Sequence, residues 1–217
     1  MGRQLRHGIA LGICSLFSST AAALLLLHCC DWLYRWDIAA LRISEATGLS
    51  QQVILRNYHA MMDYLWPLSE GAFSLPDLPF SAQGALHFAD CRRLFAIVYL
   101  VGIAAALGLL WLWRRRRRDP VDKRAFLIAG ATLVGCIALV GGALAVNPSG
   151  AFTLFHKLLF SNDYWLFDPL RDPVILLLPE QFFFHCAGVF ALFWSFSALL
   201  LVVAGRKRKI DRLRQPK

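Results

Sequence analysis

Apolar residues are concentrated in four long stretches of the chain, and polar segments separate these stretches. They cover about residues 8–30, 94–113, 125–146 and 182–205, and no Asp, Glu, Lys or Arg interrupts them. A helix needs ~20 residues to cross the ~30 Å hydrocarbon core of a bilayer, so each stretch has the length of one crossing. Because backbone polar groups inside lipid must pair within their own segment, the pattern predicts four transmembrane helices. We therefore predict an all-α polytopic membrane protein, with a single membrane domain over residues 1–217.

The first apolar stretch has features of a secretory signal, because Arg3 and Arg6 precede it. Its apolar part is longer than the about 7–15 residues of a signal core. Residues 26–28 also lack the small side chain that a lipoprotein-type cleavage site would place before Cys29. We therefore expect a retained span.

Basic residues are shared unevenly between the polar segments. Sixteen of the 23 Lys and Arg residues precede the first stretch, lie between the second and third, or follow the fourth, and five of them form the run Arg114 to Arg118. Segments 31–93 and 147–181 hold the other seven, together with eleven acids. Since positive charge accumulates on the cytoplasmic side of membrane proteins, both termini are predicted to be cytoplasmic and the two segments extracytoplasmic. The net charge of +9 thus indicates topology and contact with anionic lipid, and without a recognition module nucleic acid is not an expected partner.

The outer segment 31–93 is patterned as a cap. Trp32, Tyr34 and Trp36 follow the first span, where amphipathic rings prefer to lie, and predict an interfacial aromatic belt. Ser50 is a good helix cap, and apolar residues recur after it at helical spacing. The spacing predicts an amphipathic helix over 51–65, which rests either on the bilayer or on the helix bundle. Its apolar face and the following irregular loop contain Ile54, Tyr58, Met61, Met62 and Leu65, then Phe73, Leu75, Leu78 and Phe80 among prolines and glycines.

A histidine cluster precedes the second span. Ser81 is predicted to cap the helix, which places His87, Asp90 and Cys91 on one face. Asp90 then orients the imidazole of His87 or stabilises its charged form. Alternatively, Asp90 only complements the positive N-terminus of the helix, while the His87 side chain extends to the membrane interface. Both interpretations are open on this segment alone.

The second outer segment is richer in polar chemistry than a short connection requires. It holds His156, Lys157, the group Ser161–Asn162–Asp163, Trp165, Asp168, Asp172 and Glu180 between two spans. In a compact four-helix arrangement the outer ends of the spans are adjacent, so we expect His156 to approach His87. Ionisable groups at a membrane edge usually mark function, and the two imidazoles form a candidate site.

The order of these motifs resembles the lipoprotein intramolecular transacylase family, Lit, of bacteria. The resemblance covers all four spans and is carried by Asn57–Tyr58, Tyr64–Leu65, His87-x-x-Asp90 with Arg92 after it, Phe155–His156–Lys157, Phe160–Ser161–Asn162–Asp163-x-Trp165, Asp168–Pro169, Asp172 and Pro179–Glu180. Cys91 stands where the family is expected to have an aliphatic residue, and Gly84 where a carboxylate is expected.

The resemblance implies an acyltransferase of the bacterial cytoplasmic membrane with its site on the outer-leaflet side. Its substrate would be a diacylated lipoprotein, whose middle glycerol ester gives its acyl chain to the α-amino group of the lipidated Cys. His87 and His156 would be catalytic, with membrane lipid around them and no cofactor or metal. The matching residues expected to act electrostatically are Asp90, Lys157, Asn162, Asp163, Arg92 and Arg93, and those expected at the lipid are Tyr58, Tyr64, Trp165, Phe160 and Glu180.

The residues are suited to this chemistry independently of the resemblance. An α-amine has a pKa near 8 and must lose a proton as it attacks an ester, and an imidazole near 6.5 can accept it. Amine and ester belong to one molecule, so positioning supplies much of the rate through a cyclic transition state.

Three other functions stay open on the sequence. Cys91 with His87 as its base could form an acyl-enzyme with any lipid. The chain could also be a non-enzymatic membrane scaffold or a pH sensor with titrating histidines. A metal hydrolase would have to gather His87, His156 and His185, but no HExxH-type spacing supports it. Cys14 and Cys136 are expected to pack within spans, and Cys29, Cys30, Cys91 and Cys186 lie near the outer interface, where a disulfide is an option without a deducible pairing.

Overall fold

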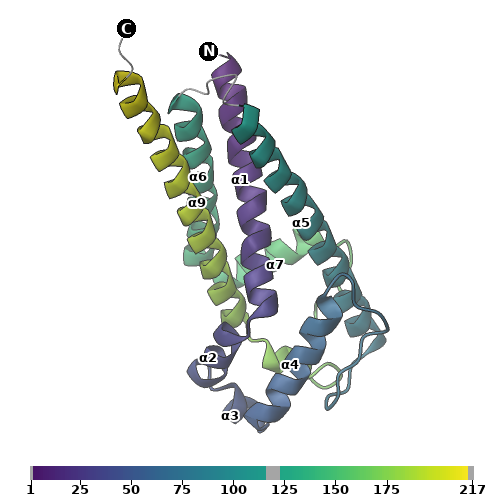
Figure 1. Ribbon diagram of the computed structural model, residues 1–217. Helices are drawn as coiled ribbons and strands as arrows, with labels where there is room; N and C mark the ends of the chain where they lie inside the picture. Colours follow the sequence, from purple (N-terminus) through teal and green to yellow (C-terminus); the bar gives the residue numbers. More distant parts are fainter. Residues whose placement is uncertain (1, 116–122, 215–217) are drawn as a thin grey trace. The chain divides into compact units, whose positions relative to one another are not determined.

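A computed structural model describes residues 2–115 and 123–214, and regular structure in these ranges is entirely helical (Figure 1). The helices are α1 (Gly2–Cys29), α2 (Trp32–Ala40), α3 (Ile43–Thr47), α4 (Gln51–Leu65), α5 (Ala82–Arg115), α6 (Lys123–Val146), α7 (Pro148–Leu159), α8 (Val174–Leu177) and α9 (Glu180–Arg214). The predicted all-α class is confirmed. Three residues of the basic run, 116–118, and the last three residues of the chain lie outside the described ranges.

Four of these helices are long and apolar enough to cross a membrane. The spans are Gln4–Cys29, Ala82–Arg115, Lys123–Val146 and Glu180–Arg206, which confirms the four predicted crossings. α5 begins twelve residues before the apolar stretch that predicted it, because Ser81 caps it and no proline follows before the stretch. This extension carries His87.

The chain forms two compact units, and each long helix contributes residues to both. We call residues 1–24, 98–143 and 188–217 the bundle unit, and residues 25–97 and 144–187 the site unit.

The bundle unit is held together by close contact between small and apolar residues. Its core consists of Leu11, Ala125, Phe126, Ala129, Leu133, Ala198 and Leu201. A Cβ on Gly102 would lie 2.1 Å from the Cβ of Ala21, so α5 approaches α1 more closely than a larger residue would permit. A hydrogen bond from Trp194 Nε1 to Thr20 Oγ1, 3.0 Å long, joins α9 to α1.

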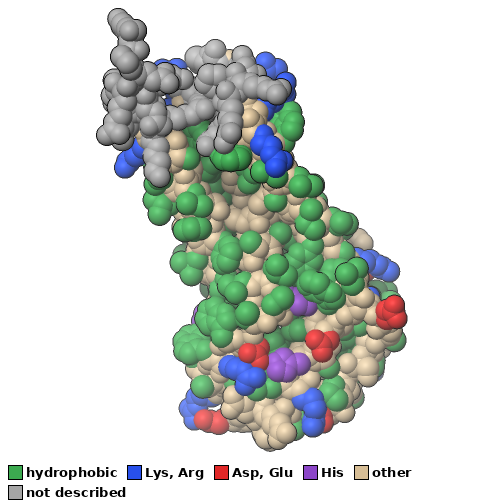
Figure 2. All heavy atoms as spheres, in the orientation of Figure 1, with side chains coloured by type: hydrophobic (Ala, Val, Ile, Leu, Met, Phe, Trp, Pro, Cys, Tyr) green, Lys and Arg blue, Asp and Glu red, His purple; other side chains and the backbone are tan. Residues whose placement is uncertain are grey.

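Many large apolar side chains are exposed on the bundle unit, as lipid requires, and they cover much of the face that Figure 2 shows. They include Leu100, Ile103, Leu107, Leu139 and Leu192. Within this unit the starts of α1 and α6 and the ends of α5 and α9 lie on one side (Figure 1). The basic segments therefore share a side, while the prediction that this side is cytoplasmic stays a prediction.

The site unit is built around α4. Ser50 Oγ accepts a hydrogen bond from Val53 N at 3.4 Å, and α4 runs from Gln51 to Leu65, which confirms the predicted helix and its cap. Its buried side holds Ile54, Asn57, Tyr58, Met61 and Leu65, whereas Met62 is only half-buried. Phe73 and Leu75 of the following irregular loop are buried, in line with the partly apolar loop that the sequence indicates.

The predicted aromatic belt is wrong for one of its three members. Trp32 and Trp36 are exposed, but Tyr34 is 1% exposed and stacks on Tyr58 with ring centroids 3.8 Å apart. Its hydroxyl donates to the carbonyl oxygen of Leu177 at 2.8 Å. Because residues 32–40 form a helix, positions four apart share a face and position 34 turns toward the core.

Helix α7 was not predicted as a separate element. Asn147 Oδ1 accepts from Gly150 N at 2.9 Å, and Pro148 occupies the first helical position. These cap and proline signals are present in the sequence and could have identified the helix. α7 follows α6 after a single residue.

Candidate active site

His87 is fixed by the start of α5. The hydroxyl of Ser81 accepts from Gly84 N at 2.9 Å, which confirms the predicted cap, and Asp172 Oδ1 accepts from Ser81 N at 2.7 Å. A Cβ on Gly84 would lie 2.3 Å from Asp172 Oδ1, so the carboxylate occupies the space that a side chain at position 84 would need. The loop that carries Asp172 is thereby attached to α5, about one helical turn before His87.

His156 lies on the buried side of α7. Its Nδ1 is 2.8 Å from the carbonyl oxygen of Phe152, one turn earlier. A carbonyl only accepts, so Nδ1 carries the hydrogen and Nε2 is left as the basic nitrogen. Burial lowers the pKa of His156, and the hydrogen bond to Phe152 partly opposes this shift. The neutral form, which can accept a proton, is therefore favoured.

The two imidazoles face one another inside the site unit. Their ring centroids are 6.1 Å apart, and His87 and His156 are 6% and 8% exposed. Aromatic rings enclose them: Phe160 lies 4.9 Å from the ring of His87, and Trp165 stacks 4.8 Å from the ring of His156. The structure thus brings together four residues named from the sequence, in apolar surroundings that exclude water.

Asp90 lies beside this pair but is bound to other groups. Its Oδ1 accepts from Arg93 at 2.8 Å, and its Oδ2 accepts from Asn162 at 3.0 Å. Asn162 Oδ1 in turn accepts from the backbone of Tyr164 at 3.1 Å. Asp90 therefore anchors the loop after α7 to α5, and among the described residues no hydrogen bond joins it to His87.

Cys91 contacts His87 directly. Its Sγ is 3.4 Å from His87 Nε2, as the helical spacing predicts. All six cysteines lie in the described part of the chain and are free thiols. Two buried polar atoms of the site have no protein partner in the described residues, His87 Nδ1 and Trp165 Nε1, and the same is true of Glu180 Oε1 at the start of α9. The other oxygen of Glu180 accepts from Ser149 at 3.0 Å.

The remaining residues named from the sequence do not surround the imidazoles. Arg92 lies over the ring of Tyr64, 5.1 Å from its centroid, while Lys157 and Asp163 are exposed. Tyr58 belongs to the core between α2 and α4, where burial raises its pKa.

A buried acid–histidine contact that the sequence did not predict joins α2 to α9. Asp37 of α2 is fully buried, and its Oδ1 accepts from His185 Nδ1 of α9 at 2.6 Å. Burial raises the pKa of Asp37, and the hydrogen bond from His185 opposes this. Asp37 and His185 are far apart in the sequence. The one local signal was an acid directly after the aromatic residues of the predicted belt.

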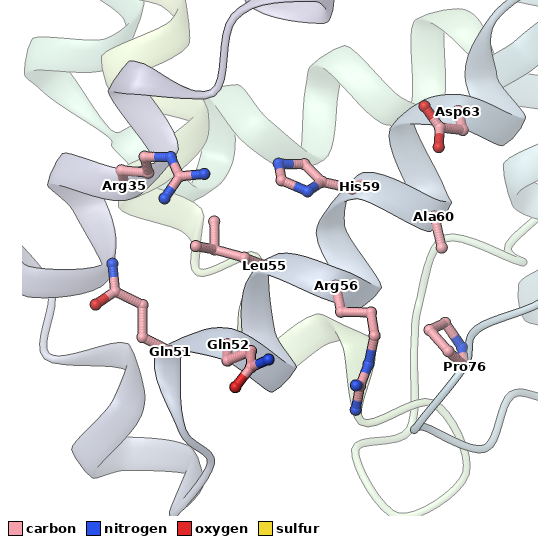
Figure 3. A pocket seen from close by; sticks show the side chains of 9 residues that line it. All are labelled: Arg35, Gln51, Gln52, Leu55, Arg56, His59, Ala60, Asp63 and Pro76. Carbon is pink, nitrogen blue, oxygen red and sulfur yellow. The ribbon is translucent and has the colours of Figure 1, made fainter.

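A polar hollow of about 750 Å³ lies on the opposite, exposed face of α4 (Figure 3). Side chains from α2, α4 and the loop after α4 line it: Arg35, Gln51, Gln52, Leu55, Arg56, His59, Ala60, Asp63 and Pro76. Arg56 is paired with Asp77, and His59 Nε2 is 2.8 Å from Asp31 Oδ2. These two lining side chains therefore already have acidic partners. The lining includes neither His87 nor His156.

Across residues 2–115 and 123–214, no group of three His, Cys, Asp or Glu side chains is arranged to hold a metal ion. His185, the third histidine considered for a metal site, is bound to Asp37.

Comparisons with known proteins agree on one family. The model of the lipoprotein intramolecular transacylase family, Lit, matches residues 8–183. An in meso structure of the membrane-integral lipoprotein intramolecular transacylase Lit from Bacillus cereus is 31% identical, with a TM-score of 0.88, and the match covers 98% of this chain and 100% of that one.

Two structures of the Bacillus cereus protein carry a replaced histidine. The histidine-to-arginine variant is 33% identical with a TM-score of 0.83, and the match covers 99% of this chain and 96% of that one. The histidine-to-alanine variant is also 33% identical with a TM-score of 0.83, and covers 98% and 97%. A search among curated proteins found no match.

Proposed function

Since this membrane-integral chain belongs to the lipoprotein intramolecular transacylase family, Lit, and is an acyltransferase, we propose that His87 and His156 catalyse its reaction. The substrate is a diacylated lipoprotein of the bacterial cell membrane, reached from the outer leaflet. The acyl chain on the middle glycerol oxygen moves to the α-amino group of the lipid-bearing Cys, which gives the lyso-form.

The observation that carries this proposal is the pair of buried imidazoles with ring centroids 6.1 Å apart. This separation brings two nitrogen bases within reach of one reacting group, and each can transfer a proton to a substrate in contact with it.

The positions of the nitrogens favour different roles for the two histidines. His156 has its Nδ1 bound to Phe152, so its Nε2 can take the proton that the amine loses as it attacks the ester carbon. His87 has an unpartnered Nδ1 and can protonate the departing glycerol oxygen. The N–C bond forms as the glycerol C–O bond breaks, and the glycerol oxygen takes its proton from His87. The proton that His156 took from nitrogen then passes to His87, so both imidazoles end neutral. No enzyme nucleophile is needed, because amine and ester are held in one molecule.

The experiment is mass spectrometry of a diacylated lipoprotein incubated with the protein. Transfer within one molecule leaves the mass unchanged, blocks the amino terminus and frees a glycerol hydroxyl. A lipase would lower the mass by one acyl group, and a transferase using phospholipid would raise it. A change by an acyl group in either direction, or a free amine after incubation with folded protein, contradicts the proposal.

The 3.4 Å contact between Cys91 Sγ and His87 Nε2 favours a second candidate reaction, acyl transfer through an acyl-enzyme. In this route the thiolate takes the acyl group as a thioester before the amine does. The thioester would add the mass of one acyl group to the protein itself, so intact-protein mass spectrometry during turnover distinguishes it.

A further inference from the structure

Trp165 is a buried donor beside the two histidines. The side chain is 8% exposed and lies in the loop between α7 and α8. Its ring stacks on His156 with centroids 4.8 Å apart and planes 27° apart. Its Nε1 is enclosed and has no hydrogen-bond partner in the described part of the chain. Since buried polar groups in proteins are normally paired, this N–H is an exception that needs a reason.

Two carboxylates of the site unit already accept hydrogen bonds from other groups. Both oxygens of Asp90 are bound, to Arg93 and Asn162, and Asp172 Oδ1 is bound to Ser81. An indole N–H can only donate, so an acceptor that arrives with the substrate would satisfy it.

The cations expected to stabilise negative charge are directed elsewhere. Lys157 is exposed, Arg92 lies over Tyr64, and Arg93 is bound to Asp90. During acyl transfer the ester carbonyl oxygen becomes an oxyanion, and preorganised donors in a water-excluded site stabilise such charge most strongly. Trp165 Nε1 is a buried donor without a partner among the described residues, on a ring that stacks on His156.

We propose that Trp165 is a catalytic residue whose indole N–H donates to the carbonyl oxygen of the transferred acyl group and stabilises the tetrahedral oxyanion. This inference rests on the proposed function. The amine nitrogen bonds to the carbonyl carbon, and the π electrons move to oxygen. They return as the bond to the glycerol oxygen breaks. The exchanged protons pass through the histidines, and Trp165 keeps its proton throughout.

The first test is Trp165→Phe, which keeps an aromatic ring on His156 and removes the N–H. Loss of one oxyanion donor typically lowers kcat ~100- to 1,000-fold, so we expect a decrease of this order with KM nearly unchanged. Trp32→Phe, at a tryptophan that is 52% exposed in the same unit, is the matched control and should keep wild-type kcat. A kcat for Trp165→Phe within about threefold of wild type overturns the inference.

A binding measurement separates the donor role from a structural one without turnover. A lipid phosphonate, whose tetrahedral centre carries an anionic oxygen, should bind Trp165→Phe at least about tenfold more weakly than wild type. A diether lipid without a carbonyl should bind both equally. Equal phosphonate affinity, or the same loss for both lipids, overturns the inference.

If Trp165→Phe does not fold, benzothienylalanine at position 165 replaces N–H by sulfur in a ring of the same shape, and the same outcomes apply. The wild-type protein tests the proposed function separately from the role of Trp165. If the wild-type protein does not block the amine of the lipoprotein at unchanged mass, the proposed function is wrong, and there is no oxyanion for Trp165 to bind.

Discussion

At the scale of residues, the two histidines illustrate how burial prepares a base. The Nδ1 of His156 donates to a backbone carbonyl, and burial lowers the pKa of the ring. Its Nε2 therefore stays unprotonated to a lower pH than in an ordinary histidine. A lowered pKa weakens the base but keeps it in the useful form at neutral pH. Phe160 and Trp165, which hold the rings in place, also remove the water that would favour the imidazolium.

This burial has a consequence for the pH dependence of the reaction. The substrate amine, with an ordinary pKa of about 7.7–8.0, must be neutral to attack. We expect log(kcat/KM) to rise with slope one up to about pH 8, and to steepen to slope two only below about pH 6.5, where His156 gains a proton. Steepening that begins above pH 6.5 would contradict the lowered pKa. The same shift makes unfolding easier in acid, because the unfolded chain binds this proton more readily.

Substitutions at the site distinguish the two chemistries. We expect His87→Ala and His156→Ala each to lower kcat ~100- to 10,000-fold, since each removes acid–base help. Cys91→Ser should keep most of the activity, and a chelator should have no effect, when initial rates are followed by mass spectrometry. An activity that dies with Cys91→Ser and returns only with cysteine would favour the thioester route.

At the scale of elements, the contact between Asp37 and His185 links α2 to α9. Removing one partner of a buried pair leaves an uncompensated polar group and typically costs about 3–5 kcal/mol. We expect His185→Ala to lower the free energy of unfolding by this order, because Asp37 is fully buried. His59→Ala, at a half-exposed contact with Asp31, should cost less than about 1 kcal/mol. Denaturant unfolding in detergent measures both.

A double replacement shows whether the cost comes from the unpaired acid. Asp37→Leu combined with His185→Leu removes both polar groups, so it should destabilise less than His185→Ala alone. Equal destabilisation would mean that packing around the pair dominates.

Helix α7 combines a buried site face with an exposed apolar face. Leu154, Phe155 and Leu158 are 56%, 55% and 75% exposed, while His156 is buried. Because α7 begins one residue after a membrane span, we expect its exposed face to contact lipid. A benzophenone side chain at position 158 should crosslink to radiolabelled phospholipid, and one at Gln52, in the polar hollow of α4, should not. Equal labelling at both positions would contradict this placement.

The sequence predicted the elements whose own pattern is strong and missed those that depend on distant partners. Uninterrupted apolar stretches and helical spacing sufficed for the four spans and for α4 with its Ser50 cap. The prediction for Tyr34 was wrong because it rested on composition alone. Three aromatic residues next to a span indicate a belt whether or not the segment is helical, and only the helix turns Tyr34 inward. The contact of Asp37 with His185 depends on tertiary packing that no local pattern encodes. The approach of His156 to His87 was expected from topology, whereas the chemistry assigned to them depends on the family resemblance.

At the scale of the whole molecule, the asymmetry of charge predicts how the chain is oriented. The sixteen basic residues of the predicted inner segments and the eleven acids of the predicted outer segments are expected on opposite sides of the membrane. Reporter tags after Lys217 and within residues 114–124 should be cytoplasmic, and a tag near Gly71 should be reachable from outside. An accessible tag in the basic run of intact cells would place the histidines on the inner leaflet and remove the lipoprotein substrate from their reach.

The carboxylate of Asp172 lies beside Gly84, the position where the family resemblance led us to expect a carboxylate. Asp172 fills the volume that a side chain at position 84 would occupy, and its charge reaches the start of α5 from another segment. The two positions therefore constrain each other's evolution. A carboxylate at position 84 is compatible with this fold only in a chain with a smaller residue at 172. In Lit homologues the two positions should therefore covary, and the acid can change its place in the sequence while keeping its place in space.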